Sequence, residues 1–203
     1  MKALLATANK GKIRELDRLL APLGVTLVGL DAFPDIRDIP ETGATFAENA
    51  LIKARAGANA SGLVCLADDS GLEVAALNGA PGVYSARYAD DEISPPGETR
   101  DQRNVRKLLR VMAAESQRNC RFVTAMAAVA PNGAEIVTLG EWRGILAREP
   151  VGENGFGYDP VFIDPTLGLS AAQLTAEQKN ARSHRNAAAV ALLAAWPDFI
   201  KKI

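Results

Sequence analysis

The segment Leu63–Ala67, Leu-Val-Cys-Leu-Ala, runs directly into Asp68-Asp69-Ser70-Gly71. Five consecutive apolar residues have the length and character of a strand that is buried on both faces. The polar residues that follow predict that this strand ends abruptly at Asp68. Ligands of open α/β sheets bind beyond the carboxyl ends of the strands, so we expect the two aspartates at a binding edge. Adjacent carboxylates can hold Mg²⁺ there and orient a water molecule, and a turn closed by an Asx hydrogen bond is the alternative.

Strands and helices are predicted to alternate around this segment. Two short strands, Lys2–Thr7 and Val25–Leu30, enclose a helical pattern that Pro22 and Gly24 end. The apolar positions of that helix are Ile13, Leu16, Leu19 and Leu20. Later helices are predicted to begin at Thr45 with Glu48, at Thr99 with Gln102, at Thr175–Gln178 and at Ser183. The helix from Thr45 is expected to run to about Ala60.

The second half of the chain predicts a β-hairpin. Arg121–Ala130 and Glu135–Trp142 flank the turn Pro131-Asn132-Gly133, and Val161–Ile163 is a further short strand. Leu77–Ala89 is expected to form turns, and the acidic segment Asp90–Glu98 a mobile surface loop. The pattern predicts an α/β fold in which helices flank a mixed central sheet. A length of 203 residues without a shift in composition favours a single domain over residues 1–203.

Charge and composition restrict the function. The chain has 23 Lys and Arg residues against 24 Asp and Glu residues, which argues against a dedicated nucleic-acid binder but leaves room for a local basic pocket. His184 is the single histidine, so a metal site built from several histidines is excluded. Any metal must be held mainly by carboxylates, which favours a hard cation such as Mg²⁺.

Cysteine use and hydropathy indicate the compartment. Cys65 and Cys120 lie in apolar segments and lack metal-ligand spacing, which is typical of buried thiols in a reducing compartment. The longest apolar run, Ala187–Trp196, is too short to span a membrane and is expected to be a buried helix face. The N-terminus does not have the pattern of a signal peptide. We therefore expect a cytoplasmic protein without a membrane segment.

Two basic segments are candidates for binding phosphate. Lys10, Gly11 and Lys12 lie where a predicted strand leads into a helix, and a helix N-terminus offers free N–H groups to an anion. A solvated basic turn explains the same residues. Lys53 lies on the helix that begins near Thr45, where a solvated lysine is the alternative. Glu41 precedes that helix and has no capping role, so it is a candidate metal partner for the aspartates.

The segment Gly152–Pro160 contains Phe156 between two glycines, so a flat ligand could stack on the ring. Asp159 would supply a hydrogen-bond acceptor beside it. The alternative is a buried phenylalanine that anchors a glycine-rich loop. Near the end of the chain, His184 and Arg185 are predicted in the first turn of a helix, with Lys179 upstream. Cations are unfavourable there, so an anion or a carbonyl-rich ligand would explain them; a structural histidine is the alternative.

Taken in order, these segments resemble the inosine triphosphate pyrophosphatase family. The matching motifs are Leu5–Lys12, Glu41–Gly43, Thr45–Ala50, Ala67–Leu72, Gly79–Tyr88, Gly155–Pro160 and Ser183–Arg185. Ala8 departs from the glycine that is usual in the family, and the loop 90–98 is longer than in typical relatives. The resemblance implies an elongated two-lobed fold with a cleft between the lobes, and a homodimer. It implies Mg²⁺-dependent hydrolysis of non-standard purine nucleoside triphosphates (ITP, dITP, XTP) to the monophosphate and pyrophosphate, which cleanses the nucleotide pool.

The resemblance also implies residue roles. Asp69 would activate the attacking water and bind Mg²⁺, with Glu41 and Asp68 in the metal shell. Phe156 would stack on the base. The residues expected to contact substrate are Thr7, Ala8, Asn9, Lys10, Gly11, Lys12, Lys53, Ser70, Phe156, Gly157, Tyr158, Asp159, Lys179, His184 and Arg185. Rival interpretations are a related pyrophosphatase for modified pyrimidines, a nucleotide sensor without hydrolysis, and a structural protein.

Overall fold

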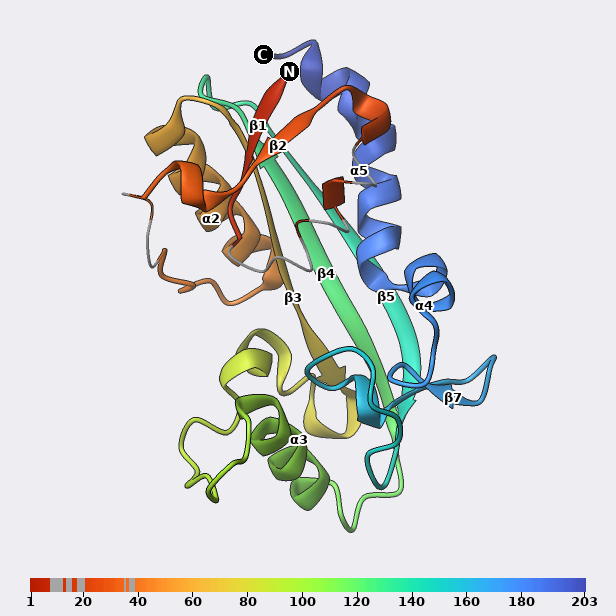
Figure 1. Cartoon of the computed structure of the whole chain (residues 1–203). Helices are drawn as coiled ribbons and strands as arrows, with labels where there is room; N and C mark the ends of the chain where they lie inside the picture. Colours follow the sequence, from red (N-terminus) through yellow and green to blue (C-terminus); the bar gives the residue numbers. More distant parts are fainter. Residues whose placement is uncertain (8–12, 14–15, 18–20, 35, 37–38) are drawn as a thin grey trace. The chain divides into compact units, whose positions relative to one another are not determined.

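The computed structural model describes residues 1–7, 13, 16–17, 21–34, 36 and 39–203 (Figure 1). The predicted phosphate-binding residues Ala8, Asn9, Lys10, Gly11 and Lys12 lie outside this part of the chain, as does most of the helix predicted after them.

The described residues form a mixed sheet of seven strands in the order β2-β1-β3-β4-β5-β6-β7. Its strands are β1 (Lys2–Leu5), β2 (Thr26–Val28), β3 (Val64–Val74), β4 (Asn119–Val129), β5 (Glu135–Leu146), β6 (Phe162–Asp164) and β7 (Leu169–Ser170). β1 pairs in parallel with β2 and β3, whereas β6 pairs antiparallel with β5 and β7. The predicted α/β fold with a mixed sheet is therefore confirmed.

The helices that the capping motifs predict are present. They are α2 (Phe46–Ser61), α3 (Arg100–Val111), α4 (Ala176–Arg182) and α5 (His184–Ile200). Both bonds of the capping box form at α3 and α4. At α2, Thr45 Oγ1 accepts from the Glu48 N–H, but the Glu48 carboxylate accepts from the N–H of Ala44 instead of Thr45. Ser183 separates α4 from α5, so His184 and Arg185 begin α5 as predicted.

The predicted end of β3 is wrong. The strand continues through Asp68 and Asp69 to Val74 and is eleven residues long. Both aspartates are buried, with 2% and 8% of their surface exposed. A strand tolerates buried carboxylates only where other groups compensate their charge, and helices α2 and α5 supply such groups here. The aspartates therefore lie within the strand and not in a turn after it.

Other boundaries also differ from the predictions. The hairpin is confirmed, with the Gly133 N–H donating to the Ala130 carbonyl at 2.9 Å, but β4 and β5 extend beyond the predicted ends at Arg121 and Trp142. β6 begins one residue later than predicted, and the sequence pattern missed β7. The segment predicted as turns contains 3₁₀ helices at Ala75–Leu77 and Gly82–Arg87.

The chain divides into two compact units, each with its own apolar core. Unit 1 is Met1–Asp69, Thr124–Gly140 and His184–Ile203, and unit 2 is Ser70–Val123 and Glu141–Ser183. The core of unit 1 includes Leu5, Leu66, Met126, Leu192 and Trp196. The core of unit 2 includes Leu72, Leu108, Phe122, Trp142 and Phe162. None of the helices in the described part of the chain combines the length and hydropathy that crossing a membrane requires.

In unit 1, α2 and α5 cover opposite faces of the sheet (Figure 1). A Cβ on Gly57 of α2 would meet Leu4 and Cys65, so the helix lies close against that face. The alternate residues Leu5 and Leu66 pack instead with Leu192 of α5. Successive side chains of a strand point to opposite faces of the sheet. Neighbouring residues of β1 and β3 therefore face different helices, one α2 and the next α5.

In unit 2, Asp164 at the end of β6 connects three elements. It accepts hydrogen bonds from Trp142 Nε1 at 2.9 Å, from Arg182 Nε at 2.7 Å, and from the N–H of Thr166 at 2.8 Å. Burial alone would raise the pKa of Asp164, but these donors and the Leu167 N–H outweigh it and lower the pKa to about 2. The ionised carboxylate thus holds β5, the β6–β7 turn and the end of α4 together.

Because the pKa of Asp164 is lower in the folded protein, its contribution to stability is present above about pH 4 and is lost as the pH falls toward 2. We expect Asp164→Asn to lower the free energy of unfolding by about 2 kcal/mol at pH 7, and the difference from the wild type to shrink between pH 4 and pH 2. Chemical denaturation across this pH range measures it, with the exposed Asp198→Asn as control. A difference that does not change with pH would contradict the assignment.

Candidate active site

One face of α2 supplies two groups to Asp69. Asn49 and Lys53 are four residues apart and therefore share a face of the helix. Asn49 Nδ2 donates to Asp69 Oδ2 at 3.0 Å, and Lys53 Nζ lies 3.5 Å from Asp69 Oδ1. The lysine also donates to Glu41 Oε1 at 2.7 Å. The Lys53 ammonium thus bridges two of the three carboxylates that the sequence proposed as metal partners, and only 12% of its side chain is exposed.

Glu41 reaches this position because the segment before α2 lies close to the helix. The Gly43 N–H donates to Asn49 Oδ1 at 2.8 Å, so Asn49 uses its amide both toward Gly43 and toward Asp69. A Cβ on Gly43 would lie 2.6 Å from the Glu48 Cβ, which is closer than real contacts allow. Glycine therefore permits the close approach that places Glu41 beside Lys53.

The two carboxylates determine the charge of Lys53. Burial alone would lower the pKa of this ammonium group. The attraction of Asp69 and the hydrogen bond to Glu41 outweigh burial, so the pKa is raised above its ordinary value of 10.5. Lys53 is therefore a permanent cation between the two carboxylates at neutral pH, and the alternative of a solvated lysine is excluded.

Asp68 has a different cationic neighbour. Arg185 Nε lies 3.8 Å from Asp68 Oδ2, and both side chains are buried. A Cβ on Gly140 of β5 would collide with the backbone of His184 and of Ala188, so this glycine allows the start of α5 to lie against the sheet. Asp68 thus supplies the negative charge that a cation in the first turn of a helix requires.

The two aspartates consequently lie on opposite faces of β3. Asp69 contacts the α2 residues and Asp68 contacts the α5 residue, as the alternation of side chains along a strand demands. The sequence treated Asp68 and Asp69 as one pair, but the strand separates their environments. Ser70 follows them in β3 and is the first residue of unit 2.

The donor chemistry on the α2 face fits a hard divalent cation. Glu41 and Asp69 provide carboxylate oxygens, the ligand type that Mg²⁺ prefers. Within residues 1–7, 13, 16–17, 21–34, 36 and 39–203, no three His, Cys, Asp or Glu side chains already stand close enough to hold one ion. In this structure the Lys53 ammonium compensates the negative charge of Glu41 and Asp69.

Unit 2 holds the second group of predicted site residues. Half of the Phe156 surface is exposed, so the alternative of a buried anchoring ring is excluded. Lys179 Nζ lies 5.1 Å from the centre of that ring and pairs with Asp159. Asp159 Oδ2 also accepts from the Phe156 N–H at 2.9 Å. The predicted base-binding residues Phe156, Asp159 and Lys179 thus form one contiguous group.

The remaining predicted residues in this loop have structural contacts. The Tyr158 side chain lies in the core of unit 2 and donates to the Ser85 carbonyl at 2.9 Å, and burial raises the pKa of its phenol. Gly157 has a φ of +60°, which favours glycine, and its N–H donates to Asp101 Oδ2 at 2.7 Å. At the other end of the chain, the Thr7 N–H donates to the Leu5 carbonyl at 2.9 Å.

Sequence reasoning missed Asn49 and Asp101 as members of the site. Asn49 lies in the quoted Thr45–Ala50 motif, four residues before Lys53, and a polar residue at helical spacing from a candidate lysine was a usable signal. Asp101 offered no such signal, because its partner Gly157 is 56 residues further along the chain.

Comparisons with known proteins agree with the fold and with the motifs. The model of the Ham1 family matches residues 3–195. The chain therefore belongs to the Ham1 family, which confirms the resemblance seen in the sequence. A relative from Nitratidesulfovibrio vulgaris named dITP/XTP pyrophosphatase is 54% identical over 198 residues, which cover 97% of this chain and 96% of the relative.

Solved structures show the same fold. The Ham1 protein of Coxiella burnetii superposes with a TM-score of 0.87 at 42% identity, covering 98% of this chain and 99% of that one. The Staphylococcus aureus Ham1 protein gives a TM-score of 0.85 at 40% identity, with 98% of both chains covered.

The position of Asn49 between Gly43 and Asp69 predicts the effect of a charge there. Asn49→Asp keeps an acceptor for Gly43 but places a second buried carboxylate against Asp69, so we expect a loss of about 2–3 kcal/mol of stability at pH 7. Glu48→Gln, one residue earlier, retains its acceptor for Ala44 and is the matched control. Thermal unfolding measures both variants, and an unchanged melting temperature for Asn49→Asp would show that the Asn49–Asp69 bond is not formed.

Proposed function

We propose that the protein hydrolyses non-standard purine nucleoside triphosphates, dITP, XTP and ITP, to the nucleoside monophosphate and pyrophosphate. The observation that carries the proposal is the buried Asp69 beside the Lys53 ammonium and Glu41. Membership of the Ham1 family and the dITP/XTP pyrophosphatases among its relatives support it. Homodimerisation and a role in cleansing the nucleotide pool belong to the same proposal and rest on the resemblance. The cytoplasmic location is also part of the proposal and rests on cysteine use and hydropathy.

In this proposal Asp69 is the general base. Its carboxylate accepts a proton from a water molecule, and the water oxygen bonds to the α-phosphorus while the bond to the bridging oxygen of the β-phosphate breaks. Pyrophosphate leaves with the electron pair of that bond. The Asn49 amide fixes the orientation of Asp69 Oδ2. A base so oriented loses little entropy when it meets the water.

The cations of the site bind the triphosphate. Lys53 faces two carboxylates in the free protein, and a phosphate oxygen would take over part of its hydrogen bonding. Lys10, Lys12 and the N–H groups of their loop would hold the remaining phosphates. Glu41 and Asp69 would hold Mg²⁺, which when bound neutralises charge that develops on the phosphate oxygens. Asp68 was expected in the metal shell. Its contact with Arg185 favours a different role, in which Asp68 compensates the charge of Arg185.

Base recognition is assigned to Phe156, Lys179 and Asp159, with Arg185 and His184 as further donors. The exposed Phe156 ring offers a face for stacking. Hypoxanthine and xanthine carry a 6-oxo acceptor where adenine carries a 6-amino donor. Lysine and arginine can only donate, so adenine would leave a donor unpaired at a cost of ~1–3 kcal/mol. The expected preference over ATP is roughly 5–150-fold, and Asp159 holds Lys179 in place for it.

A substrate panel tests the reaction class. We expect kcat/KM for dITP and XTP to exceed that for ATP and for pyrimidine triphosphates, with pyrophosphate as the first product in the presence of Mg²⁺. Separate assays of pyrophosphate and orthophosphate measure this. Orthophosphate as the first product would contradict α-phosphorus attack, and a preference for modified pyrimidines would favour the rival pyrophosphatase.

Asp69→Asn tests the general base. The amide can still accept from Asn49 but cannot take a proton, so we expect a near-normal melting temperature and a loss of about 10²–10⁴-fold in kcat. The exposed Asp31→Asn serves as the matched control. Turnover of dITP by Asp69→Asn within tenfold of the wild type would remove Asp69 from that role.

A further inference from the structure

The orientation of Phe156 depends on its backbone. Half of the residue is exposed, and Lys179 Nζ lies 5.1 Å from the centre of its ring. Gly155 and Gly157 on either side both have positive φ values, +81° and +60°. Glycines are the most flexible residues in an unconstrained chain, so hydrogen bonds must hold this segment if the ring is to keep one direction.

Two carboxylates hold the peptide groups next to the ring. The Phe156 N–H donates to Asp159 Oδ2 at 2.9 Å, and the Gly157 N–H donates to Asp101 Oδ2 at 2.7 Å. Asp159 belongs to the same loop and moves with it. Asp101 lies in the first turn of α3, so its bond ties the Gly157 peptide to that helix, while Lys179 of α4 contacts the ring and Asp159.

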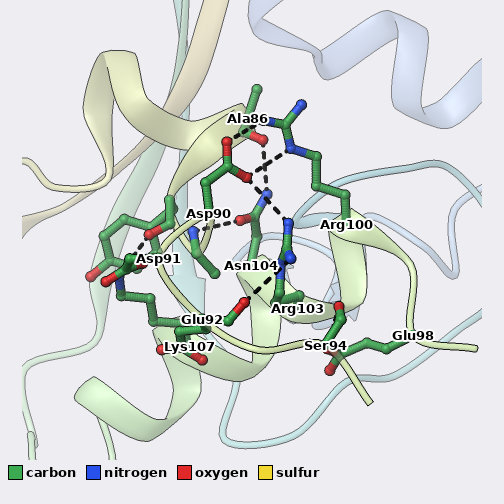
Figure 2. Close-up of polar contacts among 12 residues, drawn as sticks. Ala86, Asp90, Asp91, Glu92, Ser94, Glu98, Arg100, Arg103, Asn104 and Lys107 are labelled. Atoms are coloured by element: carbon green, nitrogen blue, oxygen red, sulfur yellow. Dashed lines mark hydrogen bonds and ion pairs between the residues drawn. The ribbon is translucent and has the colours of Figure 1, made fainter. Parts of the chain in front are cut away.

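The helix that carries Asp101 is itself held firmly (Figure 2). The acidic loop, residues 90–98, pairs with the basic side chains of α3. Arg106 Nε binds Glu98 at 2.7 Å, and Lys107 Nζ binds Asp91 at 2.6 Å. The side-chain oxygen Oδ1 of the buried Asn104 accepts from the Ala89 N–H at 2.9 Å. The loop was predicted to be a mobile surface loop; most of its residues are exposed, and its acidic groups pair with α3.

The acidic loop also pairs with the two arginines nearest to Asp101 in the sequence. Arg100 and Arg103 are one and two residues away from Asp101, so neither faces its side chain on the helix. Both donate to Asp90, with Arg100 Nε at 3.0 Å and Arg103 Nη2 at 3.2 Å from Oδ1 (Figure 2). The Asp101 carboxylate accepts from the Gly157 N–H.

We propose that Asp101 is a positioning residue for base recognition, which holds the Gly157 peptide and through it directs the Phe156 ring toward the purine. The inference rests on the proposed function, since it assumes that Phe156 stacks on the base. Asp101 contacts no reacting atom in this account. Without the Asp101 carboxylate, the Phe156 ring would become ordered only when substrate binds. The entropy cost of that ordering raises KM and leaves kcat unchanged.

Steady-state kinetics with dITP and Mg²⁺ test the proposal. We expect Asp101→Ala to raise KM about 5–20-fold, the loss of one charge-assisted hydrogen bond, with kcat within about twofold. Asp101→Asn should recover most of the wild-type KM, because its amide oxygen can accept from Gly157. Glu177→Ala, which removes an exposed acid from the first turn of α4, controls for the loss of helix-terminus charge and should leave KM unchanged.

A double-mutant cycle with Phe156→Ala separates positioning from general structure. If Asp101 acts through the ring, Asp101→Ala should change KM less than twofold in the Phe156→Ala background. An equal effect in both backgrounds, or an unchanged KM in the single variant, would overturn the inference while the proposed function stands. A wild-type protein that releases no pyrophosphate from dITP would overturn the proposed function and the inference with it.

Discussion

Two consecutive buried aspartates in the middle of a strand are the constraint on which the site depends. Because side chains alternate along β3, Asp68 and Asp69 point to opposite faces, and each requires compensation from the helix that covers its face. Asn49 and Lys53 of α2 serve Asp69, and Arg185 of α5 lies beside Asp68. Removing either helix contact would leave a buried charge uncompensated, which costs several kcal/mol. The same contacts that let the strand fold therefore place Lys53 beside Asp69 on one face and Arg185 beside Asp68 on the other.

Close packing of the helices follows from the same requirement. Gly57 and Gly140 have no room for a side chain, so α2 and α5 approach the sheet closely enough for short polar contacts. The chain thus combines close glycine contacts with charged groups on both faces of β3. In unit 2, Asp159 and Asp101 accept hydrogen bonds from the peptide groups around the half-exposed Phe156.

The features that sequence predicted best are local. The cap residues Thr99 and Thr175 satisfy N–H groups three residues away, so their helices could be located without knowledge of the fold. The hairpin around Gly133 and the first turn at His184 were predictable for the same reason. The mixed sheet followed from the alternation of strand and helix patterns. Asp69, Phe156 and Lys179 were candidates from their sequence context, and their roles rest on the family resemblance.

What sequence reasoning missed depends on distant partners. The continuation of β3 through Asp69 requires Asn49, which lies 20 residues away in the chain, and no local pattern reveals that contact. The ion pairs of Asp90 with Arg100 and Arg103 were not predicted, because these partners belong to the next helix. β7 has two residues, too few for a periodic signal. Phosphate binding by residues 8–12 stays a prediction, because these residues lie outside the described part of the chain.

The central claim is that water, activated by Asp69, attacks the α-phosphorus. Hydrolysis of dITP in water enriched in ¹⁸O, followed by mass spectrometry of both products, tests it most directly. The account predicts one ¹⁸O atom in the nucleoside monophosphate and none in pyrophosphate. Label in pyrophosphate, with an unlabelled monophosphate, would place the attack on the β-phosphorus and contradict the account.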